Sequence, residues 1–269
     1  MKKAILATID LLKILTKSGI SLQVKLQVFY AVLQLKLRRK KQSDGSVFIR
    51  FFGKEFHVCN PADTQFMIKE IWLEKPYELY PKKGIGKIAD VGANQGFSLF
   101  YFYQNFGDIR YTAMEPDERN FELLKENISA IPFSENNKPE LLKFAAWNKN
   151  TELYFSGDNS TSTTNRNFSE SGNSAIKISA IDFGKWLLEN PCDLVKLDVE
   201  GAEAEVMDSV IQNNSLTCAG HWLIEFHTER FGDKVFQKVK SAFDVVGYTY
   251  EKRGIIGYFY NLKMSESVD

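Results

Sequence analysis

A short glycine-bearing segment at residues 90–97 carries residue types and spacing that would hold a nucleotide-like ligand. It joins a short apolar strand to a predicted helix, and its pattern is D-x-G-x-x-x-G, from Asp90 to Gly96. Glycine lets the backbone approach a ligand where a Cβ would clash, and a helix start offers unpaired N–H groups. The pattern differs from the G-x-G-x-x-G that binds a pyrophosphate. A carboxylate at the strand end repels a diphosphate but suits a cationic, amino-acid-bearing ligand such as S-adenosylmethionine (SAM).

A second acidic residue, Glu115, strengthens the interpretation as a SAM site. It ends a strand-like stretch and precedes Pro116. It lies at about the distance from Asp90 at which an acidic residue accepts ribose hydroxyls in dinucleotide-binding folds. A lone glutamate before a turn proline is usually a surface residue. The combination with the glycine segment favours the ribose role.

The other distinctive stretch is residues 194–203, with the sequence L-V-K-L-D-V-E-G-A-E. It is predicted to be a buried strand with Asp198 at its carboxyl end, then a turn through Glu200 and Gly201, then a helix. In open α/β sheets, ligands bind outside the carboxyl ends of the strands. The acidic residues expected at that rim are Asp90, Glu115, Asp198 and Glu225. Such a cluster is costly unless it binds a cation or ligand dipoles, or has raised pKa values.

Three residues of this rim are candidates for catalysis. His227 is the first candidate for a base that takes a proton from a hydroxyl, Asp198 is the second, and Glu200 is predicted to orient the acceptor. Each has a structural alternative, because His227 can cap the next helix and Asp198 can hold the turn. Glu200 can be a first-turn carboxylate favoured by the helix dipole. Carboxylates suit Mg²⁺, but no third ligand is obvious beside Asp198 and Glu200, so we predict no metal.

The segments around these motifs alternate between strand and helix, which predicts a parallel sheet covered on both faces. Strands are expected at 87–92, 110–115, 141–146, 193–199 and 221–227. Helices are expected at 97–106, 117–130, 182–189, 202–213 and 231–243. Two last strands, near 245–251 and 255–262, are expected to close the sheet as an antiparallel hairpin.

In order and spacing, these motifs resemble the FkbM-type SAM-dependent methyltransferases over about residues 85 to 230. D-V-G-A-N-x-G is followed by E-P, then by K-L-D-V-E-G-A-E and an I-E-F-H strand. The D-V-E-G-A-E stretch is the specific part, since the glycine segment alone indicates only a class I methyltransferase. The resemblance implies a Rossmann-like α/β fold with a seven-stranded, mostly parallel sheet, an antiparallel last strand and helices on both faces. It also implies O-methylation of a sugar, a glycan or a secondary metabolite.

The same resemblance implies which residues hold SAM. The methionine side is expected to be lined by residues of the glycine segment, namely Asp90, Gly92, Ala93, Asn94 and Gly96. Glu115 is expected to hold the ribose. The adenine is expected to be bordered by Ala145 and Ala146, with Phe144 nearby. The implied acceptor is a small molecule or a glycan.

Residues 1–80 match no family pattern and are predicted to be an N-terminal helical extension with a β-hairpin, before a methyltransferase domain at 81–269. Two helices, a hairpin at 46–59 and a helix at 63–74 are expected. The alternating stretch 22–28 leaves a strand open as an alternative. Residues 22–41 end in a basic run, which is typical of an amphipathic helix on an anionic membrane surface. We favour the alternative, a helical cap packed on the main domain.

Composition excludes several classes of protein. The 269 residues include 34 basic and 34 acidic side chains, so no basic excess indicates nucleic acid. The 3 cysteines form no CxxC pair, which fits a reducing compartment rather than a disulfide framework or a structural zinc. No run reaches the ~18 apolar residues of a membrane span. We therefore expect a cytoplasmic protein.

Other functions are compatible with this fold plan. An NAD-dependent oxidoreductase shares the fold plan, but Asp90 occupies the position of the first glycine in the dinucleotide motif. A non-catalytic, Rossmann-like binding or membrane-associated module is the main alternative, and the intact glycine segment with Glu115 argues against it. The polar segment 156–174 is either a lid or binding loop, or a surface insertion.

Overall fold

The computed structural model describes most of the chain in six stretches. They are residues 10–37, 46–79, 84–156, 167–169, 176–227 and 232–261. Most of the polar segment 156–174 and the basic residues 38–41 lie outside these stretches. Within them, no helix has the length and apolar character needed to span a membrane. The cytoplasmic location stays a prediction.

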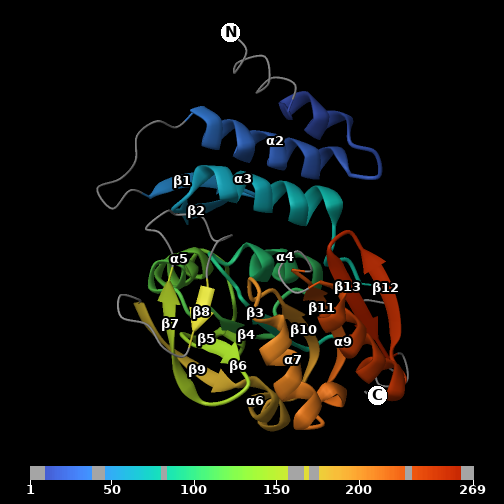
Figure 1. Ribbon diagram of the computed structural model, residues 1–269. Coiled ribbons are helices and arrows are strands. Elements are labelled where there is room, and N and C mark those ends of the chain that lie inside the picture. The colour runs from blue at the N-terminus through green and yellow to red at the C-terminus, as the bar shows by residue number, and fades with distance from the viewer. Residues whose placement is uncertain are drawn as a thin grey trace.

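The largest element is a seven-stranded sheet, whose strand order is β12-β13-β11-β10-β3-β4-β5 (Figure 1). Its strands are β3 (Lys87–Val91), β4 (Arg110–Met114), β5 (Glu140–Leu142), β10 (Cys192–Leu197), β11 (Ala219–Glu225), β12 (Thr249–Arg253) and β13 (Ile256–Tyr260). The five strands from β5 to β11 run parallel, whereas β13 runs antiparallel to both β11 and β12. The predicted fold class, including the antiparallel last strand, is confirmed.

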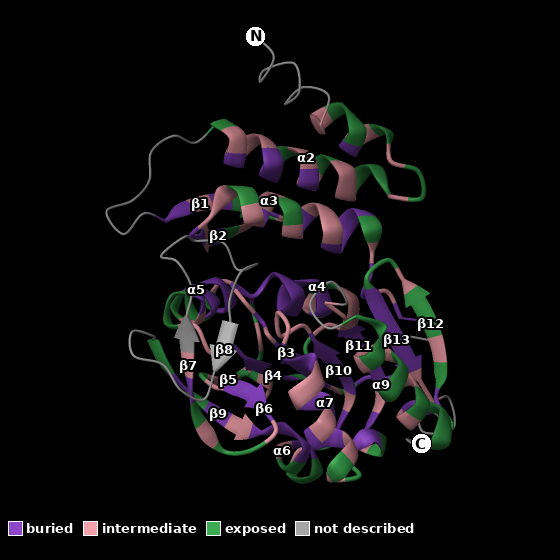
Figure 2. Cartoon of the chain, viewed as in Figure 1, coloured by how far each residue is buried: buried purple, intermediate pink, exposed green. Residues whose placement is uncertain are grey.

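Helices cover both faces of this sheet. They are α4 (Phe97–Phe106), α5 (Glu118–Ser129), α6 (Phe183–Glu189), α7 (Glu203–Gln212) and α9 (Asp233–Val245). The first two contribute to one hydrophobic core and the other three to a second core on the opposite face. Alternate residues of β3 divide accordingly, with Ile88 in the first core and Ala89 and Val91 in the second. Figure 2 shows the central strands buried and the outer sides of the helices exposed.

The N-terminal segment packs over α4 and α5 (Figure 1). It consists of α2 (Leu22–Leu37), the hairpin β1 (Val47–Phe51) and β2 (Lys54–Val58), α3 (Pro61–Lys69) and a π-helix, η1 (Glu70–Glu74). Aromatic rings make the contact, since Phe56 stacks on Phe97 with ring centroids 5.0 Å apart and Trp72 lies edge-on to Tyr101. Its core is thus continuous with the core on one face of the main sheet. The domain boundary at residues 80–81 stays a prediction.

The second N-terminal segment is a helix, α2, and not the strand left open above. Its buried side is formed by Val28, Ala31, Val32 and Leu35. The side chain of Gln27 accepts a hydrogen bond from the Phe52 N–H at 2.9 Å, which joins the helix to the turn of the hairpin. These contacts support the helical cap. Membrane contact through residues 22–41 stays a prediction.

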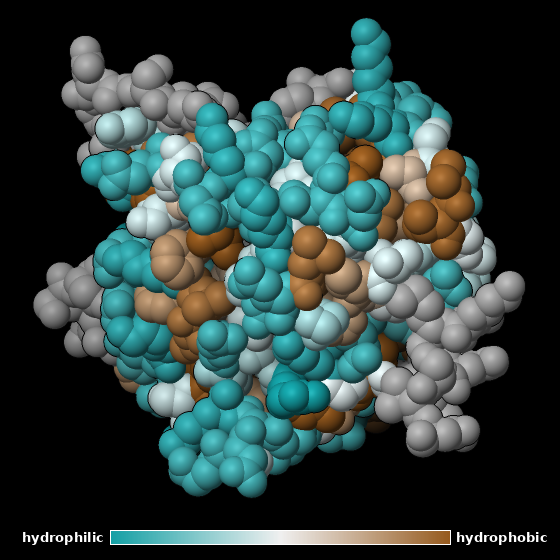
Figure 3. All heavy atoms as spheres, turned by 90° about the horizontal axis from the view of Figure 1, so that it is seen from below, coloured by the Kyte–Doolittle hydropathy of each residue, from teal (hydrophilic) through white to brown (hydrophobic). Residues whose placement is uncertain are grey.

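The end of the molecule opposite this cap is mainly hydrophilic. Figure 3 shows it from below, with hydrophobic side chains in separate patches among the described residues. Isolated apolar residues of this kind are normal on protein surfaces and indicate no binding site.

One predicted strand is wrong, because residues 141–146 do not form a single strand. β5 ends at Leu142, and β6 (Ala145–Trp147) belongs to a second sheet of order β6-β9-β7-β8. β6 pairs in parallel with β9 (Ile176–Asp182), while β7 (Thr151–Ser156) is antiparallel to β9 and to β8 (Asn167–Ser169). β5 pairs with β4, whereas β6 pairs with β9. The choice between these partners depends on tertiary packing, so the apolar residues of 141–146 do not reveal it.

Candidate active site

A pocket opens at the carboxyl ends of β3, β4 and β10, where parallel sheets bind ligands. The empty space between its walls is about 620 Å³, which includes open solvent at its mouth. The predicted residues that line it are Gly92, Asn94, Glu115, Ala145, Ala146, Asp198 and Glu200. The fold thus brings the glycine segment and the second motif to one cavity.

The turn after β3 is held by its neighbours. The N–H groups of Gly92 and Ala93 both donate to the Met114 carbonyl, each at 2.9 Å. Gly92 has φ +81°, and a Cβ there would lie 1.7 Å from the carbonyl oxygen of Asp198. The glycine is therefore required by the close approach of two segments of this chain, and its approach to a ligand stays a prediction.

Three residues predicted to line the methionine side, Asp90, Ala93 and Gly96, are absent from the described pocket wall. Asp90 is 1% exposed and accepts a hydrogen bond from Ser98 Oγ at 2.5 Å. Its side chain therefore contacts the start of α4, behind the turn. That contact lets Asp90 position the turn, and its contact with the ligand stays a prediction.

Lys196 neutralises part of the acidic rim from within the sheet. Its Nζ lies 2.7 Å from the Gly92 carbonyl oxygen, 3.3 Å from Asp90 Oδ1 and 3.4 Å from Asp198 Oδ2. Burial alone lowers the pKa of this lysine, but the charges of Asp90, Asp198 and Glu225 outweigh burial and raise it. The lysine is therefore a buried cation that ties β10 to β3 and to the glycine turn.

Glu115 is fixed at the pocket wall directly after β4. Its carboxylate accepts hydrogen bonds from the N–H of Asn94 at 2.8 Å and of Asp117 at 2.9 Å. The side chain is buried, and its oxygens connect the glycine turn with the start of α5. A carboxylate held in this way is preorganised for a ligand that offers hydroxyl groups.

The pocket wall also contains unsatisfied polar atoms. Asn94 Oδ1, Trp147 Nε1 and Asp198 Oδ1 are buried and have no hydrogen-bond partner among the described residues. Buried polar atoms in folded proteins nearly always have a partner, so this wall fits a ligand with polar groups. Ala145 and Ala146 add an apolar surface that suits a flat ring. The residues present therefore fit SAM, which has an amino-acid part, a ribose and an adenine.

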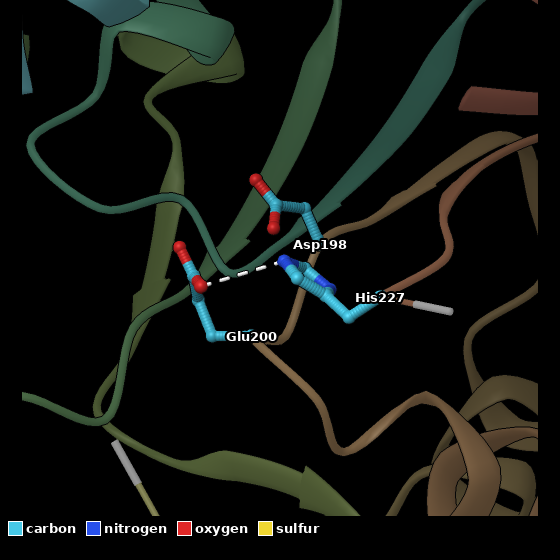
Figure 4. Close-up of side chains that lie close together, drawn as sticks. All are labelled: Asp198, Glu200 and His227. Atoms are coloured by element: carbon cyan, nitrogen blue, oxygen red, sulfur yellow. Dashed lines mark ion pairs between the residues drawn. The ribbon is translucent and has the colours of Figure 1, made fainter. Parts of the chain in front are cut away.

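An ionic cluster lies beside the pocket, where Asp198, Glu200 and His227 lie close together (Figure 4). His227 Nε2 is 3.4 Å from Glu200 Oε2, and its Nδ1 is 2.8 Å from Glu203 Oε1. Burial alone lowers the pKa of His227, but hydrogen bonds to Glu200 and Glu203 outweigh it and raise the pKa to about 11. The ring is therefore protonated at neutral pH, and a protonated ring has no lone pair with which to act as a base.

The N-terminal segment adds Glu70 to this cluster. The predicted helix 63–74 ends as an α-helix at Lys69 and continues as the π-helix η1, which begins at Glu70. Burial and the charge of Asp198 raise the pKa of Glu70 to about 6. Burial, Asp198 and Glu70 raise the pKa of Glu225 to about 9. The raised pKa values of Glu70 and Glu225 reduce the negative charge of the rim, which is one of the outcomes that its acidic composition predicts.

Sequence reasoning missed three residues of the site: Lys196, Glu70 and Trp147. A lone lysine within the apolar stretch 194–197 was the available signal for Lys196, because lysines are almost never fully buried unless paired. Glu70 gave no signal, since its helix is far from both motifs in the chain. Trp147 directly follows the alanines predicted to border the adenine. Its position in the pocket wall could not be inferred, because the strand predicted at 141–146 is interrupted at residues 143–144.

Comparison with known proteins agrees with this geometry. Residues 90–250 match the family model described as the methyltransferase FkbM domain. The solved structure of methyltransferase FkbM from Methylobacillus flagellatus KT is similar, with a TM-score of 0.52 and 13% sequence identity. The match covers 96% of this chain and 59% of that one, so this chain spans less than two thirds of the length of that relative.

Weaker structural similarities are also found. Fibrillarin from Aeropyrum pernix, solved with natively bound SAM, has a TM-score of 0.41 and 13% identity, covering 82% of this chain and 84% of that one. Fibrillarin from Methanococcus jannaschii has a TM-score of 0.40 and 13% identity, covering 83% and 84%. Similarity at this level carries no argument about function. No sequence among the curated proteins matches the chain.

The family model covers more than half of the chain and includes both motifs of the pocket. The strand order, with one antiparallel strand at the end, agrees with it. This chain therefore belongs to the FkbM methyltransferase family, with the class I methyltransferase fold and SAM as its cofactor.

Proposed function

We propose that this protein transfers the methyl group of SAM to a hydroxyl oxygen of a small-molecule or glycan acceptor. The observation that carries the proposal is that Asp198 and Glu200 line the pocket and also belong to the ionic cluster beside it. Carboxylates at that place can accept the hydrogen bond and the proton of a hydroxyl. When bound, SAM supplies a methyl group on a positively charged sulfur.

The residues of the pocket take separate roles in this proposal. Glu115 accepts hydrogen bonds from the ribose hydroxyls, and Asn94 binds the amino-acid part through its unsatisfied Oδ1. Ala145 and Ala146 pack against the adenine. Holding SAM and the acceptor hydroxyl in line lowers the activation barrier, by about 7–11 kcal/mol in favourable cases. The pocket is therefore expected to act chiefly by positioning.

Proton removal is assigned to Asp198. Its Oδ1 is buried at the pocket wall without a hydrogen-bond partner among the described residues, whereas its Oδ2 faces Lys196. A positioned base contributes about 10²–10⁴-fold to such a reaction. Glu200 orients the acceptor, and His227 positions Glu200 while it carries a proton. This order reverses the ranking of bases that the sequence alone favoured.

We propose that the acceptor enters by a second hollow of the described surface. It measures about 1530 Å³ including open solvent and lies between η1 and the β12–β13 hairpin. Glu70 lines it, and the charge of Asp198 raises the pKa of Glu70, so the hollow is electrostatically coupled to the ionic cluster. Its wall carries four glutamates against one lysine and one arginine, with the rings of Phe66 and Tyr260. This composition favours a hydroxylated acceptor without phosphate groups and supports the prediction of no nucleic-acid partner.

Replacing Glu115 with glutamine tests the assignment of the ribose. Glu115→Gln keeps the shape but removes the charge and one acceptor, so SAM affinity is expected to fall about 10- to 100-fold, since hydrogen bonds to charged groups contribute about 1.5–3 kcal/mol. Isothermal titration with SAM measures it. Glu118→Gln is the matched control, because Glu118 lies on the exposed side of α5 and pairs with Lys143. Equal SAM affinity in both variants would remove Glu115 from the site.

The reaction class is tested with SAM that carries a ¹³C-labelled methyl group. The protein is incubated with a panel of neutral mono- and oligosaccharides, hydroxylated aromatic compounds, amines and thiols. We expect label only in hydroxyl-bearing acceptors, with the carbon chemical shift of an O-methyl group. Phosphorylated sugars are expected to react more slowly than their neutral counterparts, because the hollow is acidic. Label found on nitrogen or sulfur acceptors alone would contradict O-methylation.

A further inference from the structure

Groups that bind metal ions in proteins meet beside the pocket, at the ends of β10 and β11. One carboxylate oxygen each from Asp198 and Glu200 and one ring nitrogen of His227 lie within 4.8 Å of one another (Figure 4). A cation with ligands at about 2.0–2.2 Å requires separations of about 3–4 Å between them, so side-chain shifts on the order of 1 Å would close the site. The third ligand, missing from the sequence argument, is thus supplied by the fold.

A buried carboxylate outside this trio orients the histidine. The side chain of Glu203 is 1% exposed, and its Oε1 lies 2.8 Å from His227 Nδ1. That contact leaves His227 Nε2 on the side of Glu200, at 3.4 Å from Glu200 Oε2. Metal-binding histidines almost always donate their other ring N–H to a carboxylate or carbonyl in this way. The pairing is therefore the arrangement expected of a histidine ligand.

Unsatisfied oxygens indicate that the cluster lacks a partner. Glu203 Oε2 and Asp198 Oδ1 are buried and have no hydrogen-bond partner among the described residues. Lys196 faces only the other oxygen of Asp198, Oδ2, at 3.4 Å. A cation between Asp198 and His227 would bind Oδ1 directly and offset the charge of Glu203 through the imidazole.

We propose that Asp198, Glu200 and His227 bind a divalent cation beside the SAM pocket, and that this cation coordinates the acceptor hydroxyl. The second half rests on the proposed function, and the first half does not. Two carboxylates with one imidazole suit Mn²⁺ or Mg²⁺ better than a thiolate-seeking metal. The cation takes the place of the proton on His227 Nε2, since a histidine binds metal only when that nitrogen is deprotonated. Coordination then helps the acceptor hydroxyl release its proton to solvent, so Asp198 acts as a ligand and this route replaces proton transfer to Asp198. The oxygen lone pair then forms the carbon–oxygen bond, and the electrons of the broken carbon–sulfur bond stay on sulfur.

Mn²⁺ alone is the probe for the site, added to the full chain without SAM or acceptor. Electron paramagnetic resonance of free Mn²⁺ and calorimetry are expected to show one bound ion per chain, displaced by excess Mg²⁺. Asp198→Asn, Glu200→Gln and His227→Gln are each expected to weaken binding at least tenfold. Glu203→Gln is expected to weaken it about 10- to 100-fold, as is usual for groups that orient a ligand.

Asp208→Asn is the matched control, since Asp208 lies on the same helix as Glu203 but pairs with Lys238 on the surface. It is expected to leave Mn²⁺ affinity unchanged. Absence of saturable binding, or equal affinity in wild type, Glu200→Gln and His227→Gln, overturns the site. Glu200 is part-exposed, so its variant is expected to fold even if the buried variants do not. Methyl transfer that continues undiminished after chelation overturns only the coordination of the acceptor.

Discussion

Replacing Lys196 with methionine is expected to lower the free energy of unfolding by about 3–5 kcal/mol, the usual cost of removing one partner from a buried ion pair. The cost arises because Asp90, which is 1% exposed, loses the Lys196 ammonium that lies 3.3 Å from its Oδ1. Domains of this kind are stable by about 5–15 kcal/mol, so the loss is a large share of the total. Urea unfolding followed by circular dichroism measures it.

A double substitution separates the effect of the lost charge on stability from the effect of the changed side-chain volume. Lys196→Met combined with Asp90→Asn removes both charges of the pair, and it is expected to recover a substantial part of the stability lost by Lys196→Met. Lys185→Met is the matched control, because Lys185 pairs with Asp182 from a side chain that is 68% exposed. That control is expected to cost less than about 1 kcal/mol. Equal effects of the buried and the exposed substitutions would show that Lys196 is not the counter-ion of the rim.

The core of the fold could be predicted because its signals are local. α4 follows β3 and α7 follows β10, and each of these two junctions has glycine and an acidic residue in or beside it, visible in a short stretch of sequence. Long-range choices were not visible in this way. The chain leaves the main sheet after Leu142 and joins a different sheet at Ala145. Both halves are apolar, so only the identity of the pairing strand, which is distant in sequence, separates them.

The residues of the candidate site also differ in whether a local sequence signal identifies them. Glu115, Asp198 and Glu200 could be located because each follows a strand of a parallel sheet, where ligands bind. The groups that interact with these carboxylates could not be located from the sequence. Lys196 lies beside Asp198 within the sheet, and Glu70 comes from the N-terminal segment. The sequence therefore indicated a costly acidic rim, and the structure shows how a buried lysine and raised carboxyl pKa values relieve it.

Replacing Gly92 with alanine is expected to have the largest effect on SAM affinity of any single methyl group added to this chain. The new Cβ would lie 1.7 Å from the carbonyl oxygen of Asp198, in a residue with φ +81°. The left-handed conformation costs about 1–2 kcal/mol, and the overlap adds about 1–3 kcal/mol by forcing the end of β10 away. We expect unfolding to become easier by about 2–5 kcal/mol and SAM binding to be lost.

Gly107→Ala separates these two costs. Gly107 has a similar φ of +77°, but a Cβ there would have nothing within 4 Å. It is therefore expected to show the backbone cost alone, with SAM affinity unchanged. Thermal unfolding and SAM titration of both variants give the comparison. If Gly92→Ala loses no more stability than Gly107→Ala and still binds SAM, the glycine turn and the end of β10 do not constrain each other. The pocket would then have to be built from another part of the rim.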